Sequence, residues 1–458
     1  MQAKKFNSSK AKKTKKITSS KPKFQQKNAA ADGYILWSLF GLLLLTYYLF
    51  WADFFPNNAS ALGHDYRYVM PRLLAGYYWF ETNGLWAVPY FTPSYCGGDV
   101  FFTDPQNNYF SIPQFLTFII NPLAAIKWTV LIFSVIGFSG FYLLLRRIFQ
   151  LPVAISFFAA ALFFLNDYFI YRMIIGHVGY HPFMLLPWVV LALFWQRNGG
   201  LKQHLISSTL TAAIFAYVFY GGGVHLLIPM FLMVIILLII AKLFGVEVGK
   251  IYLRLGLFIG MVLLLSGAKL SIALATLANL PRSHLPLDGI HSFFYAIWLP
   301  IKALFFAVPT YEYTKNFIGH TIILSRHEFQ IGVSIVPLII IIIGFISKFS
   351  AIKNRLLQHK ILAIILIGLL LIPIFVNYYT PAWNAFLKQI PIIKNSYSLF
   401  RWYSIFIPLV ILLAALLLNI WRLNSKQQWL IVIGFLALAL AQKFSVNNDY
   451  DSNCRNLT

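Results

Sequence analysis

A polar stretch in the first third of the chain holds an unusual share of its acidic residues. The 458 residues include only 13 aspartates and glutamates, and four of these lie close together: Asp65, Glu81, Asp99 and Asp104. A carboxylate of this kind acts as a general base on a hydroxyl group or binds a divalent cation such as Mg²⁺ or Mn²⁺. We therefore expect this stretch to carry the chemistry of the protein.

Asp65 is the first candidate, because it stands in the sequence Gly63-His64-Asp65-Tyr66-Arg67. The flanking His64 and Arg67 favour a functional interpretation and are secondary candidates themselves. Asp99 and Asp104 stand at turns marked by Gly97-Gly98 and Pro105, and such turns present polar side chains from loops. They fit two interpretations equally well: acidic or metal-binding companions of Asp65, or ordinary solvated turn residues.

A second group of polar residues lies further along, in a stretch that contains Arg172, His177 and His181. Guanidinium and imidazolium groups suit a phosphate or pyrophosphate, and the start of the next helix adds a preference for an anion. The alternative is structural: Asp167 pairs with Arg172, and His181 caps the helix. A zinc site is a minor alternative, because the spacing places no third ligand.

Two later stretches bring basic residues close to the start of an apolar segment. The first contains Arg326 and Glu328, and the second ends at Arg401. Either arginine could extend to lipid headgroups. Basic residues are disfavoured in short outer loops, however, so an arginine there points to a binding role.

The composition assigns the chain to the membrane proteins. It is 59% hydrophobic and 11% charged, with a mean hydropathy of +0.71. Soluble domains carry roughly 25% charged residues. The net charge of +24 does not indicate nucleic acid, because ten lysines lie in residues 4–27 and most other basic residues end apolar runs. This is the positive-inside pattern.

We predict an all-α, polytopic transmembrane helical bundle with about eleven spans and a large first outer loop. A disordered, basic cytoplasmic tail (1–32) precedes a transmembrane domain (33–445) and a short outer tail (446–458). The site is expected in the outer loop 55–112 and the outer segment 279–330. The spans are expected at 33–54, 124–145, 153–170, 182–195, 205–220, 226–241, 255–278, 331–347, 361–377, 402–421 and 428–444.

This count places the N-terminus inside and the C-terminus outside. The short basic clusters at span ends then fall inside, except those around Lys388, Lys394 and Arg401. Residues 67–81 are expected to lie along the membrane interface, and 293–309 to form an interfacial or re-entrant helix. The only cysteines, Cys96 and Cys454, both fall outside, where a bridge between them is neither required nor excluded.

The order of these features resembles the GT-C superfamily of membrane glycosyltransferases. The motifs Gly63-His-Asp65, Cys96-Gly-Gly-Asp99 and Asp104-Pro-Gln are similar to the first loop of YfhO-type bacterial multi-pass membrane proteins. Similar motifs follow at Gly176-His177, His181-Pro182-Phe183, Gln330-Ile331-Gly332 and 391–401. The resemblance implies a polyprenyl-phosphate-linked sugar donor and Asp65 as the catalytic base or metal contact. The chain departs from the family in having a single early aspartate and no large C-terminal soluble domain.

The leading hypothesis is thus a glycosyltransferase of the inner membrane. It would transfer a sugar on the outer face to a glycan, lipid or protein acceptor. Asp65 would deprotonate the acceptor, and Arg172, His177, His181 and Arg401 would bind the lipid phosphate. The alternatives are a lipid or polysaccharide transporter or flippase, and a non-catalytic membrane protein of a glycan pathway. No nucleic acid and no certain cofactor is expected.

Overall fold

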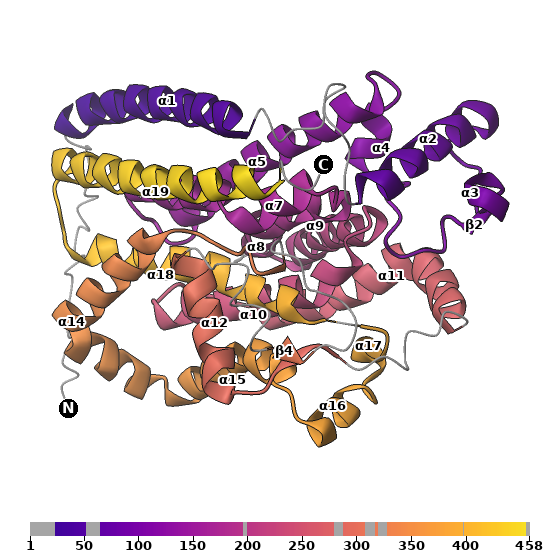
Figure 1. Cartoon of the computed structure of the whole chain (residues 1–458). Coiled ribbons are helices and arrows are strands. Elements are labelled where there is room, and N and C mark those ends of the chain that lie inside the picture. The colour runs from indigo at the N-terminus through magenta and orange to yellow at the C-terminus, as the bar shows by residue number, and fades with distance from the viewer. Residues whose placement is uncertain are drawn as a thin grey trace, which may run out of the picture.

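The computed structural model describes residues 23–51, 65–195, 199–278, 287–306, 317–318, 328–396 and 398–454. This part of the chain is almost entirely helical (Figure 1). Its strands have two residues each and form two antiparallel pairs, in which β1 (Phe91–Thr92) pairs with β2 (Asp99–Val100), and β3 (Gly289–Ile290) with β4 (Phe317–Ile318). The predicted all-α class is therefore confirmed.

The helices follow one another along the described chain, with short 3₁₀ helices at three of the turns. They are α1 (Lys23–Trp51), α2 (Tyr66–Asn83), α3 (Ser94–Gly97), α4 (Ile112–Leu116), α5 (Pro122–Arg147), α6 (Val153–Phe164), α7 (Asp167–Ile174), η2 (Val178–Leu185), α8 (Leu186–Phe194), α9 (Leu201–Tyr220), η3 (Val224–Leu226), α10 (Leu227–Leu243), α11 (Ile251–Ala278), α12 (Phe293–Phe305), α14 (Ile335–Gln358), α15 (Lys360–Asn377), α16 (Pro381–Leu387), α17 (Pro391–Lys394), η5 (Phe400–Ile405), α18 (Phe406–Ile420) and α19 (Ser425–Cys454).

Eight helical segments of the described chain are long and apolar enough to cross a membrane, which makes this a multi-pass membrane protein. They are Pro122–Arg147, Val153–Ile174, Val224–Leu243, Ile251–Thr276, Ile335–Gln358, Lys360–Asn377, Phe400–Ile420 and Ser425–Ser445. Each coincides with an expected span, but the count differs from the eleven predicted.

Three expected spans, the first, fourth and fifth, are not among the eight segments, and each has a physical reason. The apolar parts of the first and fourth expected spans, Gly33–Leu49 and Val178–Phe194, have 17 residues each. A straight span needs about 20 residues. The fifth, α9, is long enough, but its first turn contains Lys202, Gln203 and His204, which lower its mean hydropathy.

Several predicted boundaries also move. Helix α1 begins at Lys23, inside the segment expected to be a disordered tail, and α19 continues to Cys454, through most of the expected outer tail. Residues 67–81 do form a helix, α2, and 293–305 of the segment 293–309 form α12. The side chains of Cys96 and Cys454 lie outside the described part of the structure, so their pairing remains untested.

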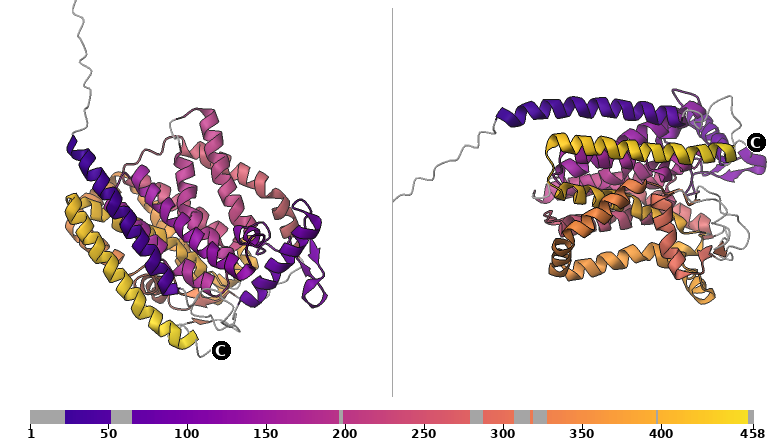
Figure 2. Two further views of the ribbon diagram at one scale, coloured as in Figure 1. Left: turned by 90° about the horizontal axis from the view of Figure 1, so that it is seen from above. Right: turned by 60° about the vertical axis from the view of Figure 1, so that its left-hand side comes forward.

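Helix α6 is the centre of the bundle. The segment Val153–Ile174 is 94% buried, far more than any other candidate span, and three consecutive alanines (159–161) let neighbouring helices approach closely. Helices α5, α18, α19 and α1 all pack against α6. Figures 1 and 2 show α1 and α19 along the same side of the molecule.

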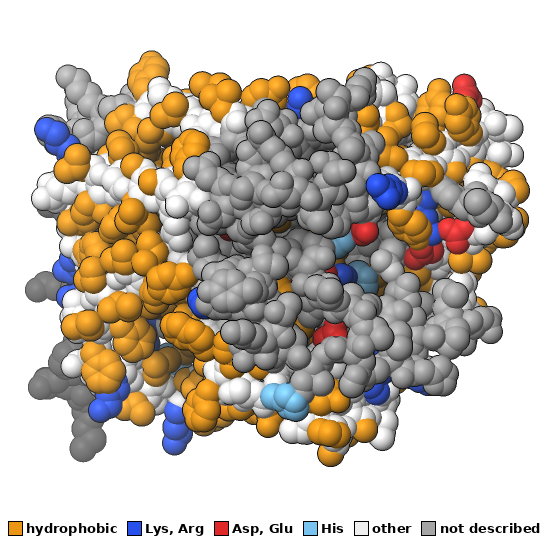
Figure 3. All heavy atoms as spheres, viewed as in Figure 1, with side chains coloured by type: hydrophobic (Ala, Val, Ile, Leu, Met, Phe, Trp, Pro, Cys, Tyr) orange, Lys and Arg blue, Asp and Glu red, His pale blue; other side chains and the backbone are white. Residues whose placement is uncertain are grey.

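The bundle has two chemically different ends. At one, called here the basic end, α5 closes with Arg146 and Arg147, and α14 and α15 meet between Lys348 and Lys360. At the other, the polar end, lie α2, the β1–β2 hairpin and the turn after α7. In Figure 3 the charged side chains at the left edge are basic, whereas the visible acidic ones lie in the middle and right.

Candidate functional site

Asp65 is placed by close contact between the start of α2 and the turn that follows α7. The Asp65 amide donates to the carbonyl of Ile175 at 3.2 Å, and the Tyr66 hydroxyl donates to that of Met173 at 2.5 Å. Gly176 between them has φ +89°, and a Cβ there would lie 2.6 Å from the Tyr66 nitrogen. A larger residue would separate the two elements. Gly176 is therefore the residue that allows Asp65 to lie beside His177.

Five ionisable side chains from four regions of the sequence form one network, called here the charged cluster: Asp65, Arg172, His177, Glu328 and Arg401. His177 Nε2 lies 2.7 Å from Asp65 Oδ2, and its Nδ1 lies 3.2 Å from an Arg172 nitrogen. Arginine can only donate, so Nδ1 must accept, and Nε2–H donates to Asp65. This arrangement describes a neutral imidazole that orients the carboxylate.

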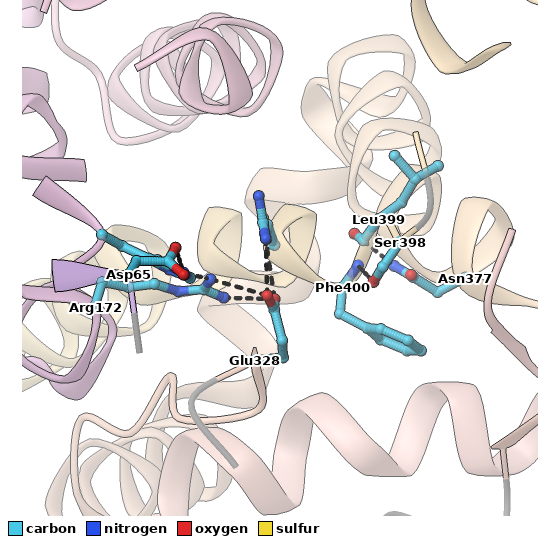
Figure 4. A network of polar contacts seen from close by, with 9 residues as sticks. Asp65, Arg172, Glu328, Asn377, Ser398, Leu399 and Phe400 are labelled. Atoms are coloured by element: carbon cyan, nitrogen blue, oxygen red, sulfur yellow. Dashed lines mark hydrogen bonds and ion pairs between the residues drawn. The ribbon is translucent and has the colours of Figure 1, made fainter. Parts of the chain in front are cut away.

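Glu328 joins the two arginines of the charged cluster (Figure 4). Arg172 donates to both of its oxygens, at 3.1 and 2.7 Å, and Arg401 also donates to both, at 2.8 and 3.3 Å. The Arg172 and Glu328 side chains are 0% and 7% exposed, whereas Arg401 is 23% and Asp65 54% exposed. The water-facing groups of the cluster are thus Asp65 and Arg401.

The aromatic ring of Tyr180 lies beside both arginines of the charged cluster. The guanidinium carbons of Arg172 and Arg401 lie 4.9 and 5.5 Å from the centre of its ring, within the range of cation–π attraction. The rings of His177 and His225 stack on the same tyrosine, with centroids 5.6 and 6.4 Å away. Two cations, two imidazoles and one buried aromatic ring therefore share a single site.

A second buried ion pair holds the segment that carries Glu328. The Asp167 amide donates to the carbonyl of Gly332 at 2.9 Å, and Lys443 Nζ donates to the same oxygen at 3.1 Å. Lys443 also forms an ion pair with the Asp167 carboxylate, and both side chains are 8% exposed. A Cβ at Gly332 would lie 2.3 Å from that carboxylate. Helix α19 thereby fixes the backbone four residues beyond Glu328.

Asp99 and Asp104 lie in a separate group, called here the Arg72 cluster, which consists of Tyr68, Arg72, Asp99 and Asp104. Arg72 contacts Asp104 at 2.6 Å and also pairs with Asp99. The Tyr68 hydroxyl donates to Asp104 at 3.1 Å, and its ring lies 3.8 Å from the Arg72 guanidinium carbon. Arg72 is two helical turns beyond Asp65, roughly 10 Å along α2. The two aspartates therefore neutralise an arginine instead of lying against Asp65.

Burial and charge shift two pKa values in the Arg72 cluster. Burial lowers the pKa of the Arg72 guanidinium, but the charges of Asp104 and Asp99 and the contact with Tyr68 outweigh this effect, so the pKa is raised. Burial, followed by the charge of Asp104, raises the pKa of the Tyr68 hydroxyl. Both shifts move the titration of Tyr68 and Arg72 further above the neutral range.

The other predicted site residues lie elsewhere. His181 is completely buried, with Nδ1 2.7 Å from the carbonyl of Val178 and Nε2 2.7 Å from the Tyr217 hydroxyl, so it is a core histidine outside the charged cluster. Arg67 is exposed on α2. His64 and Arg326 lie outside the described residues. Within the described chain, no three His, Cys, Asp or Glu side chains are grouped to hold a metal ion.

The alternative in which Asp167 pairs with Arg172 is wrong. Asp167 pairs with Lys443, and Arg172 pairs with Glu328. Sequence reasoning also missed Arg72, Lys443 and Tyr180. A lysine inside the last apolar segment and a tyrosine between two histidines were visible signals, but neither identifies its partner.

The glycines before His225 allow a close approach of two segments. A Cβ at Gly222, where φ is +82°, would lie 2.4 Å from the Asn108 side chain.

No protein-family model matches the chain, and neither a curated protein nor a solved structure matches it.

Proposed function

We propose that the protein is a membrane glycosyltransferase of the GT-C type that takes its sugar from a polyprenyl-phosphate-linked donor. The observation that carries the proposal is the charged cluster itself. An exposed carboxylate, Asp65, is held by a neutral imidazole in the same network as a partly exposed guanidinium, Arg401. A base and a phosphate-binding cation are the two groups that transfer from a lipid phosphate requires.

In the proposed reaction, Asp65 removes the proton from an acceptor hydroxyl. The acceptor oxygen forms a bond to the anomeric carbon, and the bond from that carbon to the lipid phosphate breaks with inversion. The phosphate leaves with the electron pair, and Arg401 stabilises its growing negative charge. His177 orients Asp65, while Arg172 and Glu328 hold His177 and Arg401 in place.

The proposed topology places the N-terminus in the cytoplasm, the polar end on the outer face of the inner membrane and the C-terminus outside. It is supported by the basic residues at the opposite end of the bundle, which matches the positive-inside rule. Donor lipid would reach Arg401 from the bilayer, and the glycan, lipid or protein acceptor from the outer water phase.

The decisive experiment compares Asp65→Asn with Asp99→Asn, a matched change of an aspartate that contacts Arg72. Purified protein in lipid nanodiscs is given polyprenyl-phosphate glucose or mannose, and sugar transfer to glycan acceptors is measured. Loss of a general base predicts at least a 100-fold lower rate for Asp65→Asn. Asp99→Asn should retain most activity. Equal rates for wild type and Asp65→Asn would refute the proposal.

A lipid or polysaccharide transporter is the second candidate. The observation that favours it is the Asp167–Lys443 pair, because ionisable groups inside membrane helices are typical of transport pathways. This candidate predicts movement of a labelled polyprenyl-phosphate lipid across vesicles, with no transfer of sugar. It also predicts that Asp65→Asn leaves that movement unchanged.

A further inference from the structure

A groove runs along the bundle between α5, α8 and α9, far from the charged cluster. Its volume is about 830 Å³, within the roughly 300–1,000 Å³ of pockets that hold small-molecule ligands. The lining is largely apolar and includes Leu143, Trp188, Leu210 and Ile214. Arg147 lies in the lining, and none of the described lining residues is acidic. The described lining of the groove thus combines a long apolar wall with one cation.

The walls of the groove are fixed by contacts within the bundle. The Trp188 indole donates to the carbonyl of Ile136 at 2.9 Å, and a Cβ at Gly140 would lie 2.6 Å from that ring. Behind the groove, the fully buried Arg254 donates to the carbonyl of Trp195 at 2.7 Å and so holds the end of α8. These contacts shape the groove without any ligand.

The position of the groove identifies its surroundings. Arg147 is the last residue of a candidate membrane span, so it stands where that span meets the lipid headgroups. Leu210, on the wall contributed by α9, is 48% exposed. An exposed leucine in this place faces hydrocarbon. The groove therefore passes from headgroup level into the apolar part of the bilayer.

We propose that this groove binds one anionic phospholipid of the leaflet at the basic end. An acyl chain would lie along Trp188, Leu210 and Ile214, and the phosphate group would lie against Arg147. Charge complementarity favours an anionic headgroup, because basic pockets between membrane helices bind such headgroups. The neighbouring Arg146 donates to the carbonyl of Leu151, which leaves Arg147 as the residue that faces the groove.

This site is independent of the proposed transfer reaction, because it lies at the opposite end of the bundle and uses none of the charged cluster. A lipid that fills it would stabilise the packing of α5 against α8 and α9 without taking part in chemistry.

The test uses native mass spectrometry of the full chain released from detergent, titrated with phosphatidylglycerol and, separately, phosphatidylcholine. One phosphatidylglycerol should bind more tightly than phosphatidylcholine. Arg147→Gln should reduce that preference about fivefold, the effect expected for one basic residue near a headgroup. Arg422→Gln is the control, because Arg422 is an exposed basic residue just beyond the end of α18, outside the groove lining.

A second variant, Ala192→Phe, fills the groove without changing its charge and should remove the tightly bound lipid of either class. The proposal is overturned if Arg422→Gln lowers the preference as much as Arg147→Gln. It is also overturned if Arg147→Gln leaves the preference for phosphatidylglycerol unchanged.

Discussion

The charged cluster and the Arg72 cluster differ in how many carboxylates each guanidinium group contacts. In the Arg72 cluster one guanidinium contacts two carboxylates, Asp99 and Asp104. In the charged cluster two guanidinium groups contact one carboxylate, Glu328. Either aspartate can be lost without leaving Arg72 unpaired, whereas Arg172 and Arg401 share the single carboxylate of Glu328. The first arrangement tolerates change and the second does not.

The two clusters also differ in how exposed their aspartate side chains are. The Asp99 and Asp104 side chains are 28% and 14% exposed, and both oppose Arg72 directly. Asp65 is 54% exposed, and its Oδ2 accepts from the imidazole of His177, which the geometry makes neutral. This contrast is why Asp65, and not Asp99 or Asp104, is assigned the role of base.

The sharpest test of the contrast is to neutralise one carboxylate in each cluster. Glu328→Gln removes the carboxylate that the buried Arg172 and the partly exposed Arg401 share, and should lower the free energy of unfolding by about 3–5 kcal/mol. Asp99→Asn leaves the Arg72–Asp104 pair and should cost less than about 1 kcal/mol. Denaturant unfolding in detergent measures both values. Similar losses for the two variants would show that the number of carboxylates in contact with each arginine does not affect the free energy of unfolding.

A smaller loss of stability is expected when the ion pair between Lys443 of α19 and Asp167 is broken. Lys443→Met leaves Asp167 buried without its cation and should cost about 2–4 kcal/mol. The double variant Lys443→Met with Asp167→Asn removes the unpaired charge and should recover at least half of that loss. The same unfolding measurement applies to all three variants. Additive losses in the double variant would contradict a direct pairing of the two side chains.

How well a feature of the structure can be predicted depends on how far apart in the sequence the residues that form it lie. The helical bundle and every candidate span follow from apolar runs, because a span is a local property of about 20 residues. Asp65, Arg172, His177 and Arg401 were chosen as charged residues beside apolar segments, and the structure brings them together through Glu328. The sequence supplied the candidates, but no local pattern indicates which carboxylate meets which arginine.

The missed partners show the same limit. Lys443 meets Asp167 across 276 positions, and no spacing rule connects them. His181 resembles His177 in its sequence context, yet one ring lies in the core and the other on Asp65, because Gly176 turns the chain between α7 and η2. Even the number of spans depended on α9, whose polar first turn lowers its hydropathy without shortening the helix.

The smallest predicted effect concerns pH in the Arg72 cluster. The folded state raises the pKa of Tyr68 above its ordinary value of about 10, so the folded protein holds this proton more tightly than the unfolded chain does. The stabilisation is complete below pH 10 and falls as the pH rises through the raised pKa.

Tyr68→Phe removes the titrating group, and its stability should therefore decline less steeply above pH 10 than that of wild type. Tyr90→Phe, a change at a 55% exposed tyrosine just before β1, is the control. Unfolding measured at pH 8 and pH 11 gives the two slopes. A slope for Tyr68→Phe equal to that of wild type would mean that neither burial nor the Asp104 carboxylate raises the pKa of this hydroxyl.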